Sequence, residues 1–264
     1  MCKKVLFLSV LLRIQRTLPD YISRMIPECR HFSVKDSAGG AFACAAAFPA
    51  DYETSAERYP VVYLMGGADV LPVMTLLRPR FGRDIRPFIL VGIEGKDWNA
   101  PFSPWPEPKL GKNLGPFAGG GPEFLKMLLT QVKPFADAEF RTLPDAENTA
   151  LAGYSLAGLL TLYALFNRAE FSRFACMSGS LWFPDFVNYA ASHKVIAGNP
   201  RLFLSLGDRE KESRNPLMSK VDECTRNVLA ALSPLNPHFE SNPGGHFNDV
   251  PRRIADGIAY IMKK

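Results

Sequence analysis

The chain has few cysteines, and none of them forms a pair typical of metal binding or redox chemistry. Among its 264 residues are 5 cysteines, an odd number, and no two of them show the C-x-x-C spacing. This pattern argues against a disulfide framework and against a structural zinc site, and it favours a reducing compartment. The cysteines are Cys2, Cys29, Cys44, Cys176 and Cys224.

Long basic runs and long apolar runs are also missing. No more than two Lys or Arg residues stand together, and 31 basic against 26 acidic residues give a formal net charge of only +5. The sequence therefore contains no basic run that would bind the phosphate backbone of a nucleic acid, and we expect no nucleic-acid partner. Because no apolar run approaches the roughly 18 residues of a membrane helix, we expect no membrane partner either.

Residues 1–27 are interpreted as an N-terminal extension. Lys3-Lys4 and the apolar residues 5–12 resemble the start of a secretion signal, but two arginines interrupt the run and no small-x-small cleavage site follows. We therefore expect a soluble, cytoplasmic protein, with secretion as the alternative. Residues 28–264 are interpreted as one domain, because they show neither an internal repeat nor a change of composition.

Short apolar runs alternate with helical patterns along the domain. The runs contain Val, Ile, Leu and Phe without polar alternation, which is typical of strands buried on both faces. The alternation predicts an α/β fold with a mostly parallel sheet and helices on both faces. An antiparallel hairpin precedes it, with strands at 30–35 and 41–48 and a turn at 36–40. The other expected strands are 61–65, 88–93, 149–153, 174–177 and 202–206, and the expected helices are 123–135, 156–167, 216–232 and 250–262.

Residues 95–122 interrupt this alternation. They contain Trp98, Trp105, several prolines and a run of three glycines at 119–121. A connection of this length inside a compact domain is often functional, so both tryptophans are candidate substrate contacts in a wall or flap over an apolar pocket. A surface loop packed by its own aromatic residues is the alternative. The glycines do not form a phosphate-binding loop, because no Lys-Ser/Thr pair follows them.

The strongest functional signal surrounds Ser155. A predicted strand leads through Gly153 and Tyr154 to this serine, small Ala157 follows, and a predicted helix begins. The pattern is typical of the nucleophile elbow of α/β-hydrolases, where a sharp turn tolerates only small neighbours around the serine. The helix N-terminus favours the negative charge that develops on a substrate. A serine that merely caps the helix is the alternative.

A serine nucleophile needs a base, and the chain contains 4 histidines. The α/β-hydrolase order of serine, acid and histidine excludes His31. His193 falls at a predicted helix end, and His238 opens the last predicted strand. His246 lies in a glycine-rich loop before the last helix, from which its ring can reach the serine. We therefore predict His246 as the base.

The acid is expected directly after the strand at 202–206. Asp208, Glu210 and Glu212 all lie there. The spacing from Gly207 favours Glu210, with Asp208 as the alternative and Glu212 third. The carboxylate would fix the histidine tautomer and stabilise the imidazolium, and without it the site would be a Ser–His dyad.

Two backbone N–H groups are expected to bind the oxyanion. One belongs to Leu156, the residue after the nucleophile, and the other to Ala68, after the strand at 61–65. Gly67 in the same turn is a candidate substrate contact. A plain turn is the alternative for these glycines.

Together, these segments resemble the putative esterase family of the α/β-hydrolase fold, which includes esterase D, siderophore trilactone esterases, feruloyl esterases and mycolyltransferases. The resemblance covers about residues 30–262 and rests on residues 59–67, 153–159, 174–182, 206–210 and 245–247. The Ser-x-Ser-x-Trp run at 178–182 is most similar to the siderophore esterases. The resemblance implies that Ser155, His246 and Glu210 act as nucleophile, base and acid, and that Trp182 is a pocket wall.

The sequence therefore predicts a serine esterase that hydrolyses a small-molecule carboxylic ester through an acyl-enzyme, with neither a metal nor an organic cofactor. An acyltransferase would use the same acyl-enzyme and is one alternative. A hydrolase-fold protein that binds a ligand without turnover is the other. The sequence leaves the oligomeric state open.

Overall fold

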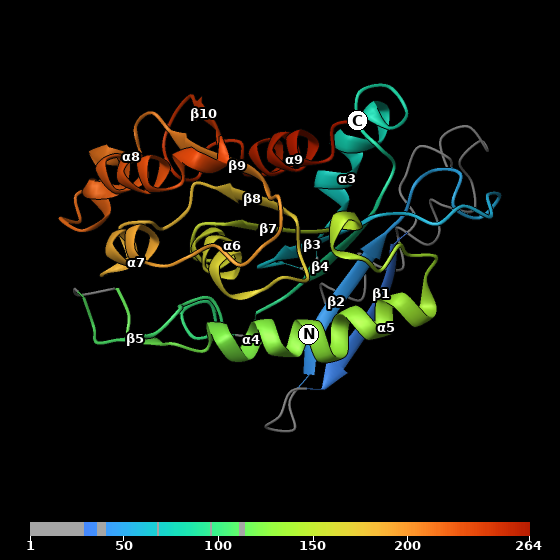
Figure 1. Ribbon diagram of the computed structural model, residues 1–264, viewed down its shortest axis with the longest axis horizontal. Helices are drawn as coiled ribbons and strands as arrows, with labels where there is room; N and C mark the ends of the chain where they lie inside the picture. Colours follow the sequence, from blue (N-terminus) through green and yellow to red (C-terminus); the bar gives the residue numbers. More distant parts are fainter. Residues whose placement is uncertain (1–28, 36–40, 68, 96, 111–113) are drawn as a thin grey trace, which may run out of the picture.

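The computed structural model describes residues 29–35, 41–67, 69–95, 97–110 and 114–264. Its main element is an 8-stranded sheet with the strand order β1-β2-β4-β3-β7-β8-β9-β10 (Figure 1). The strands are β1 (Cys29–Lys35), β2 (Ala41–Ala47), β3 (Val61–Met65), β4 (Ile89–Ile93), β5 (Pro106–Glu107), β6 (Phe117–Ala118), β7 (Thr149–Tyr154), β8 (Arg173–Met177), β9 (Arg201–Gly207) and β10 (His238–Asn242).

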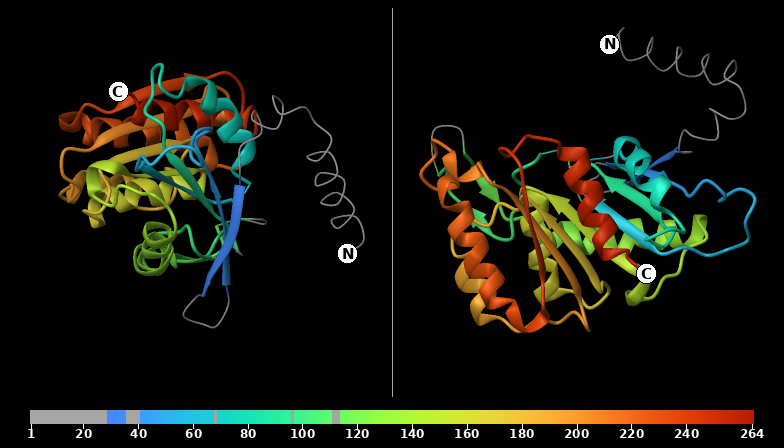
Figure 2. Two further views of the ribbon diagram at one scale, coloured as in Figure 1. Left: turned by 90° about the vertical axis from the view of Figure 1, so that its right-hand side faces the viewer. Right: turned by 90° about the horizontal axis from the view of Figure 1, so that it is seen from above.

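Helices surround the sheet. They are α3 (Leu71–Leu77), α4 (Gly121–Met127), α5 (Lys133–Glu139), α6 (Leu156–Asn167), α7 (Phe186–Ser192), α8 (Val221–Ala231) and α9 (Val250–Ile261). Short turns of helix are η1 (Arg78–Arg80), η2 (Leu128–Val132), η3 (Ala146–Asn148), η4 (Glu210–Glu212), η5 (Met218–Lys220) and η6 (Ser233–Leu235). Figure 2 shows α9 lying over one face of the sheet.

The sheet is mostly parallel. β2 pairs antiparallel with both β1 and β4, and the pairs from β4 through β3, β7, β8 and β9 to β10 are all parallel. The predicted α/β-hydrolase architecture, with its antiparallel N-terminal hairpin, is confirmed. The predicted hairpin turn at 36–40 and the predicted extension at 1–27 lie outside the described residues.

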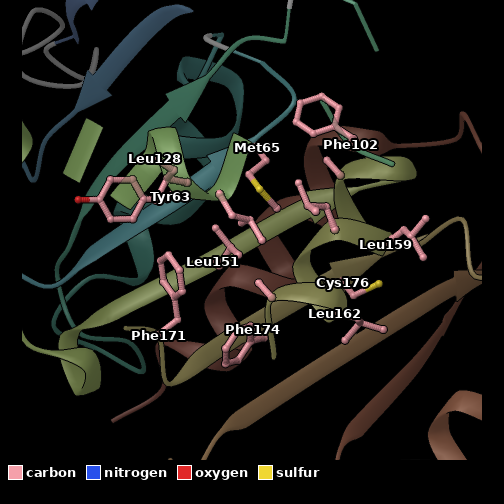
Figure 3. Packing of buried hydrophobic residues seen from close by; sticks show 14 of the residues in the cluster. Tyr63, Met65, Phe102, Leu128, Leu151, Leu159, Leu162, Phe171, Phe174 and Cys176 are labelled. Carbon is pink, nitrogen blue, oxygen red and sulfur yellow. The ribbon is translucent and has the colours of Figure 1, made fainter. Parts of the chain in front are cut away.

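Alternation along the strands builds a hydrophobic core on each face of the sheet. In β3, Tyr63 and Met65 belong to one cluster of buried side chains, while Val62 and Leu64 belong to the other. Residues two apart on a strand share a face, so a strand without polar residues feeds both cores. Helices α3 and α9 supply the smaller cluster, and α4, α6 and α8 supply the larger one. Figure 3 shows part of the larger cluster, where residues of β7 and β8 gather with residues of α6.

The helices differ from the prediction in four places. The expected helix at 123–135 is divided into α4, a π-helical turn η2 and α5. Pro134 at the start of α5 has no N–H to donate, which prevents a regular helix from running through this point. Helix α3 was not predicted, and only the end of α7, near His193, was expected, because each helix has only 7 residues and shows too little of the helical period. The helix expected from residue 216 begins at Val221.

The parallel strands bring three distant segments to one edge of the sheet. β7, β8, β9 and β10 are successive parallel neighbours, so their carboxyl ends lie on the same side. Ser155 follows β7, Glu210 follows β9, and His246 follows β10. In open α/β sheets this edge is where ligands bind.

Candidate active site

Ser155 occupies a sharp turn between β7 and α6. Its φ of 59° and ψ of −123° lie outside the usual regions for an L-residue, so the backbone is strained here. Gly153 permits the turn, because a Cβ at this position would stand 2.2 Å from the carbonyl oxygen of Ala157. The Ser155 N–H donates to the carbonyl of Met177 on β8 at 3.1 Å. The neighbouring strand therefore holds the serine in this conformation.

A chain of hydrogen bonds links Ser155, His246 and Glu210. Ser155 Oγ lies 3.0 Å from His246 Nε2, and His246 Nδ1 lies 2.6 Å from Glu210 Oε2. A carboxylate can only accept a hydrogen bond, so Nδ1 carries the imidazole proton. Nε2 is then free to accept the proton of the serine hydroxyl.

The Glu210 carboxyl group is ionised although its side chain is only 4% exposed. Burial raises the pKa of Glu210, but the hydrogen bond and charge of His246, aided by Ser178 and the Gly207 N–H, lower it below its ordinary value. The Gly207 N–H donates to Oε1 at 2.8 Å. A buried negative charge therefore faces the imidazole ring at neutral pH.

The other two candidate acids lie in different contacts. Asp208 Oδ1 accepts a hydrogen bond from the N–H of Gly244 at 2.8 Å. Glu212 pairs with the exposed Arg209 at 3.0 Å. Of the three carboxylates after β9, Glu210 is the one brought to His246, and Asp208 instead supports the loop that carries the histidine.

Leu156 is the first residue of α6, so its backbone N–H has no earlier turn of helix to donate to. The N–H groups of Gly66 and Gly67 both donate to the carbonyl of Ile93, at 3.0 and 3.1 Å. These two groups are therefore already engaged. Ala68, the second predicted oxyanion donor, lies outside the described residues.

Ser155 and His246 open onto a cleft of about 770 Å³. Apolar side chains form its walls, and none of the described residues that line it is Lys or Arg. Phe247 stands at the mouth beside His246 and is 88% exposed. One wall comes from α3 and α9, with Pro72, Val73, Val250, Pro251 and Ile254, and the other contains Trp182, Met218 and Val221.

The candidate substrate contacts are divided between the cleft and the interior. Gly67, Trp98 and Trp182 line the cleft. The Trp98 ring packs on the backbone of Gly66, where a Cβ would stand 2.8 Å from it. Trp105 is a correction to the prediction, because its ring packs against Phe183, Phe186, Tyr163 and Tyr189 rather than in the cleft lining. Residues 95–122 thus supply one tryptophan to the cleft and one to an aromatic cluster behind the cleft residue Trp182.

Residues 37–231 match the family model described as putative esterase. The chain belongs to this esterase family. The matched segment includes Ser155 and Glu210 and ends before His246. Membership makes the chain a carboxylic ester hydrolase, as the resemblance implied.

Individual relatives of the esterase are distant in sequence and similar in structure. The Bacillus subtilis protein YbbA is 24% identical over 187 residues, which cover 70% of this chain and 75% of YbbA. An IroE-like serine hydrolase from Shewanella oneidensis has a TM-score of 0.75 at 22% identity, covering 89% of this chain and 80% of that one. The siderophore hydrolase EstA from Aspergillus nidulans has a TM-score of 0.74 at 19% identity, covering 89% and 94%. At these identities the two structures establish the fold.

Four residues of the esterase's site were not singled out from the sequence. Ser180 Oγ lies 3.3 Å from Ser155 Oγ, and Phe247 lines the cleft. Tyr154 donates to the carbonyl of His246, and Arg253 donates to the carboxylate of Glu210. Arg253 had a detectable signal, because it shares the apolar face of α9 with Gly257 and Ile258, four and five positions further along. Ser180 and Phe247 lie in loops. A loop has no hydrophobic periodicity, so its sequence does not indicate which side chains face the cleft and which face solvent.

The described residues contain neither a metal-binding cluster nor a membrane-crossing helix. Within these residues, no three or more His, Cys, Asp and Glu side chains gather as a metal site would require. Among the described helices, none combines the length and the apolar character needed to cross a bilayer.

Proposed function

We propose that this protein is a serine esterase in which Ser155 is the nucleophile, His246 the general base and Glu210 the acid of a triad. The observation that carries the proposal is the hydrogen-bond chain from Ser155 Oγ through His246 to Glu210, at 3.0 and 2.6 Å, at the edge of the cleft. Nucleophile, base and orienting acid in this order are the arrangement that activates a serine. We assign this chemistry to residues 28–264.

The reaction proceeds in two halves. His246 Nε2 accepts the proton of Ser155 as Oγ attacks the ester carbonyl carbon, and the Leu156 N–H, with the predicted Ala68 N–H, binds the resulting oxyanion. The imidazolium then protonates the departing alcohol, which leaves an acyl-enzyme. Water gives a proton to His246 and attacks the acyl carbon, and the proton returns to Ser155 Oγ as the carboxylic acid is released.

The substrate we propose is a small uncharged ester with apolar groups on both sides of the carbonyl. Apolar walls flank Ser155 on the α3–α9 side and on the Trp182 side, so neither half of the ester needs a charged group. The charged side chains among the described lining residues are acidic, Asp69 and Glu210, which disfavours an anionic substrate.

The acyl-enzyme is tested by product partitioning in water–methanol mixtures. Phenyl butyrate and p-nitrophenyl butyrate share an acyl group and differ in the leaving alcohol. A common acyl-enzyme gives the same ratio of methyl butyrate to butyric acid from both esters, because the leaving group has gone before the second nucleophile arrives. A ratio that changes with the leaving group would mean that water attacks the ester directly. A ratio far above that set by the solvent composition would favour the acyltransferase alternative.

Phe247 is expected to contribute to substrate binding. Phe247→Ala should raise KM for p-nitrophenyl butyrate about tenfold with a smaller change in kcat, because the substrate covers part of the exposed ring at the cleft mouth. The matched control is Phe239→Ala, which removes an exposed ring on β10 that does not line the cleft. Equal KM values for wild type and Phe247→Ala would contradict a role in binding.

A further inference from the structure

Arg253 is a buried cation in the region of the catalytic groups. It lies on α9, its side chain is 3% exposed, and its Nη1 stands 3.3 Å from Glu210 Oε1. The adjacent Arg252 is 67% exposed and pairs with Asp256 on the surface. Burial of a guanidinium costs free energy unless its charge and its N–H groups are paired. The groups that pair with Arg253 are therefore the groups that α9 can hold in place.

The partners of Arg253 include the acid, the loop that carries the base, and two hydroxyl groups at the ends of β7 and β8. Nη1 also lies 3.2 Å from the Tyr154 hydroxyl and 3.2 Å from Ser178 Oγ, and Nη2 donates to the carbonyl of Pro243 at 2.8 Å. The Tyr154 hydroxyl in turn donates to the backbone carbonyl of His246 at 2.6 Å. The loop at 243–246 is therefore held at both ends, directly by Arg253 and through Tyr154.

The two oxygens of Glu210 have different partners. Oε2 faces His246 Nδ1, while Oε1 accepts from the Gly207 N–H and lies next to Arg253. Rotation of the carboxylate away from the imidazole would break the contacts of Oε1. The guanidinium contacts both the Glu210 carboxylate and the loop that carries His246. The orientation of the acid therefore depends on the position of this loop.

We propose that Arg253 is a positioning residue of the esterase, which holds Glu210 and the 243–246 loop so that His246 stands between the acid and Ser155. The inference rests on the proposed function. A guanidinium suits this task because its planar fork can bond a carboxylate and a carbonyl at once.

The test compares Arg253→Met and Arg253→Lys with the surface control Arg252→Met. For Arg253→Met we expect kcat to fall on the order of 10²-fold with little change in KM, because the base is displaced from the serine. Arg253→Lys should restore only part of kcat, because one ammonium cannot replace the fork. Arg252→Met should match wild type. If Arg253→Met lost activity only in proportion to its unfolded fraction, the proposal would be overturned.

A measurement without substrate separates this inference from the proposed function. The proton between His246 Nδ1 and Glu210 should give a far-downfield proton NMR signal in wild type that is lost by exchange in Arg253→Met and present in Arg252→Met. If Arg253→Met keeps the signal while wild type hydrolyses esters, the positioning role fails alone. If the signal depends on Arg253 while wild type turns over no ester, the proposed function fails and the positioning of Glu210 and His246 by Arg253 is upheld.

Discussion

Ser155→Ala should lower kcat for ester hydrolysis by roughly 10⁴- to 10⁶-fold, because the hydroxyl is the only atom of the proposed triad that bonds the acyl group. The structure gives a direct reason for its reactivity. Its Oγ lies 3.0 Å from His246 Nε2, and the strained turn holds it at the start of α6. A fluorophosphonate should therefore add once to wild type, as seen by intact mass, and not at all to Ser155→Ala.

Ser180→Ala is the matched control for this experiment. The Ser180 hydroxyl lies 3.3 Å from that of Ser155 and lines the same cleft. In the described structure it makes no hydrogen bond to the imidazole of His246, which instead contacts Ser155. We expect this variant to keep the single adduct. An adduct that survives in Ser155→Ala and disappears in Ser180→Ala would move the nucleophile to Ser180.

Glu210→Gln should cost on the order of 10⁴-fold in kcat. The amide can donate a hydrogen bond to Nδ1, which favours the tautomer that carries its proton on Nε2 and removes the acceptor that Ser155 needs. It also removes the buried negative charge that stabilises the imidazolium. Because the Glu210 pKa lies below its ordinary value, wild type keeps this charge through mildly acidic pH, and the variant should be impaired over the whole of that range.

Asp208→Asn distinguishes the two carboxylates that the sequence left in competition. Asp208 accepts one backbone hydrogen bond, from Gly244, and the loss of its charge should cost about tenfold or less in kcat. Steady-state kinetics of Glu210→Gln and Asp208→Asn with one aryl ester are sufficient to compare the two losses in kcat. A larger loss for Asp208→Asn than for Glu210→Gln would reverse the assignment of the acid.

The elements that position the site were predictable because their sequence patterns are local. β3 and α6 have the predicted bounds, since buried strands read as uninterrupted apolar runs and α6 follows directly from the elbow. The spacing that favoured Glu210 also has a local cause. Glu210 is the first residue of η4, and its carboxylate accepts the N–H of Gly207, three residues earlier.

Features that depend on distant contacts were not predictable in the same way. Aromatic content singled out Trp98 and Trp105 equally, but only the position of α7 determines that Trp105 packs inward while Trp98 lies over Gly66. Likewise, the helical period places Arg253 on the buried face of α9 without indicating which carboxylate and which carbonyl it contacts.

The position of Arg253 on α9 has a consequence for the order in which the enzyme becomes active during synthesis. Ser155 and Glu210 can be folded on the growing sheet once β9 has paired, but the histidine loop is tethered from α9, which also covers β7, β8 and β9. A nascent chain that lacks α9 would carry its nucleophile without an aligned base. Esterase activity would therefore begin only after this helix has left the ribosome and docked on the sheet.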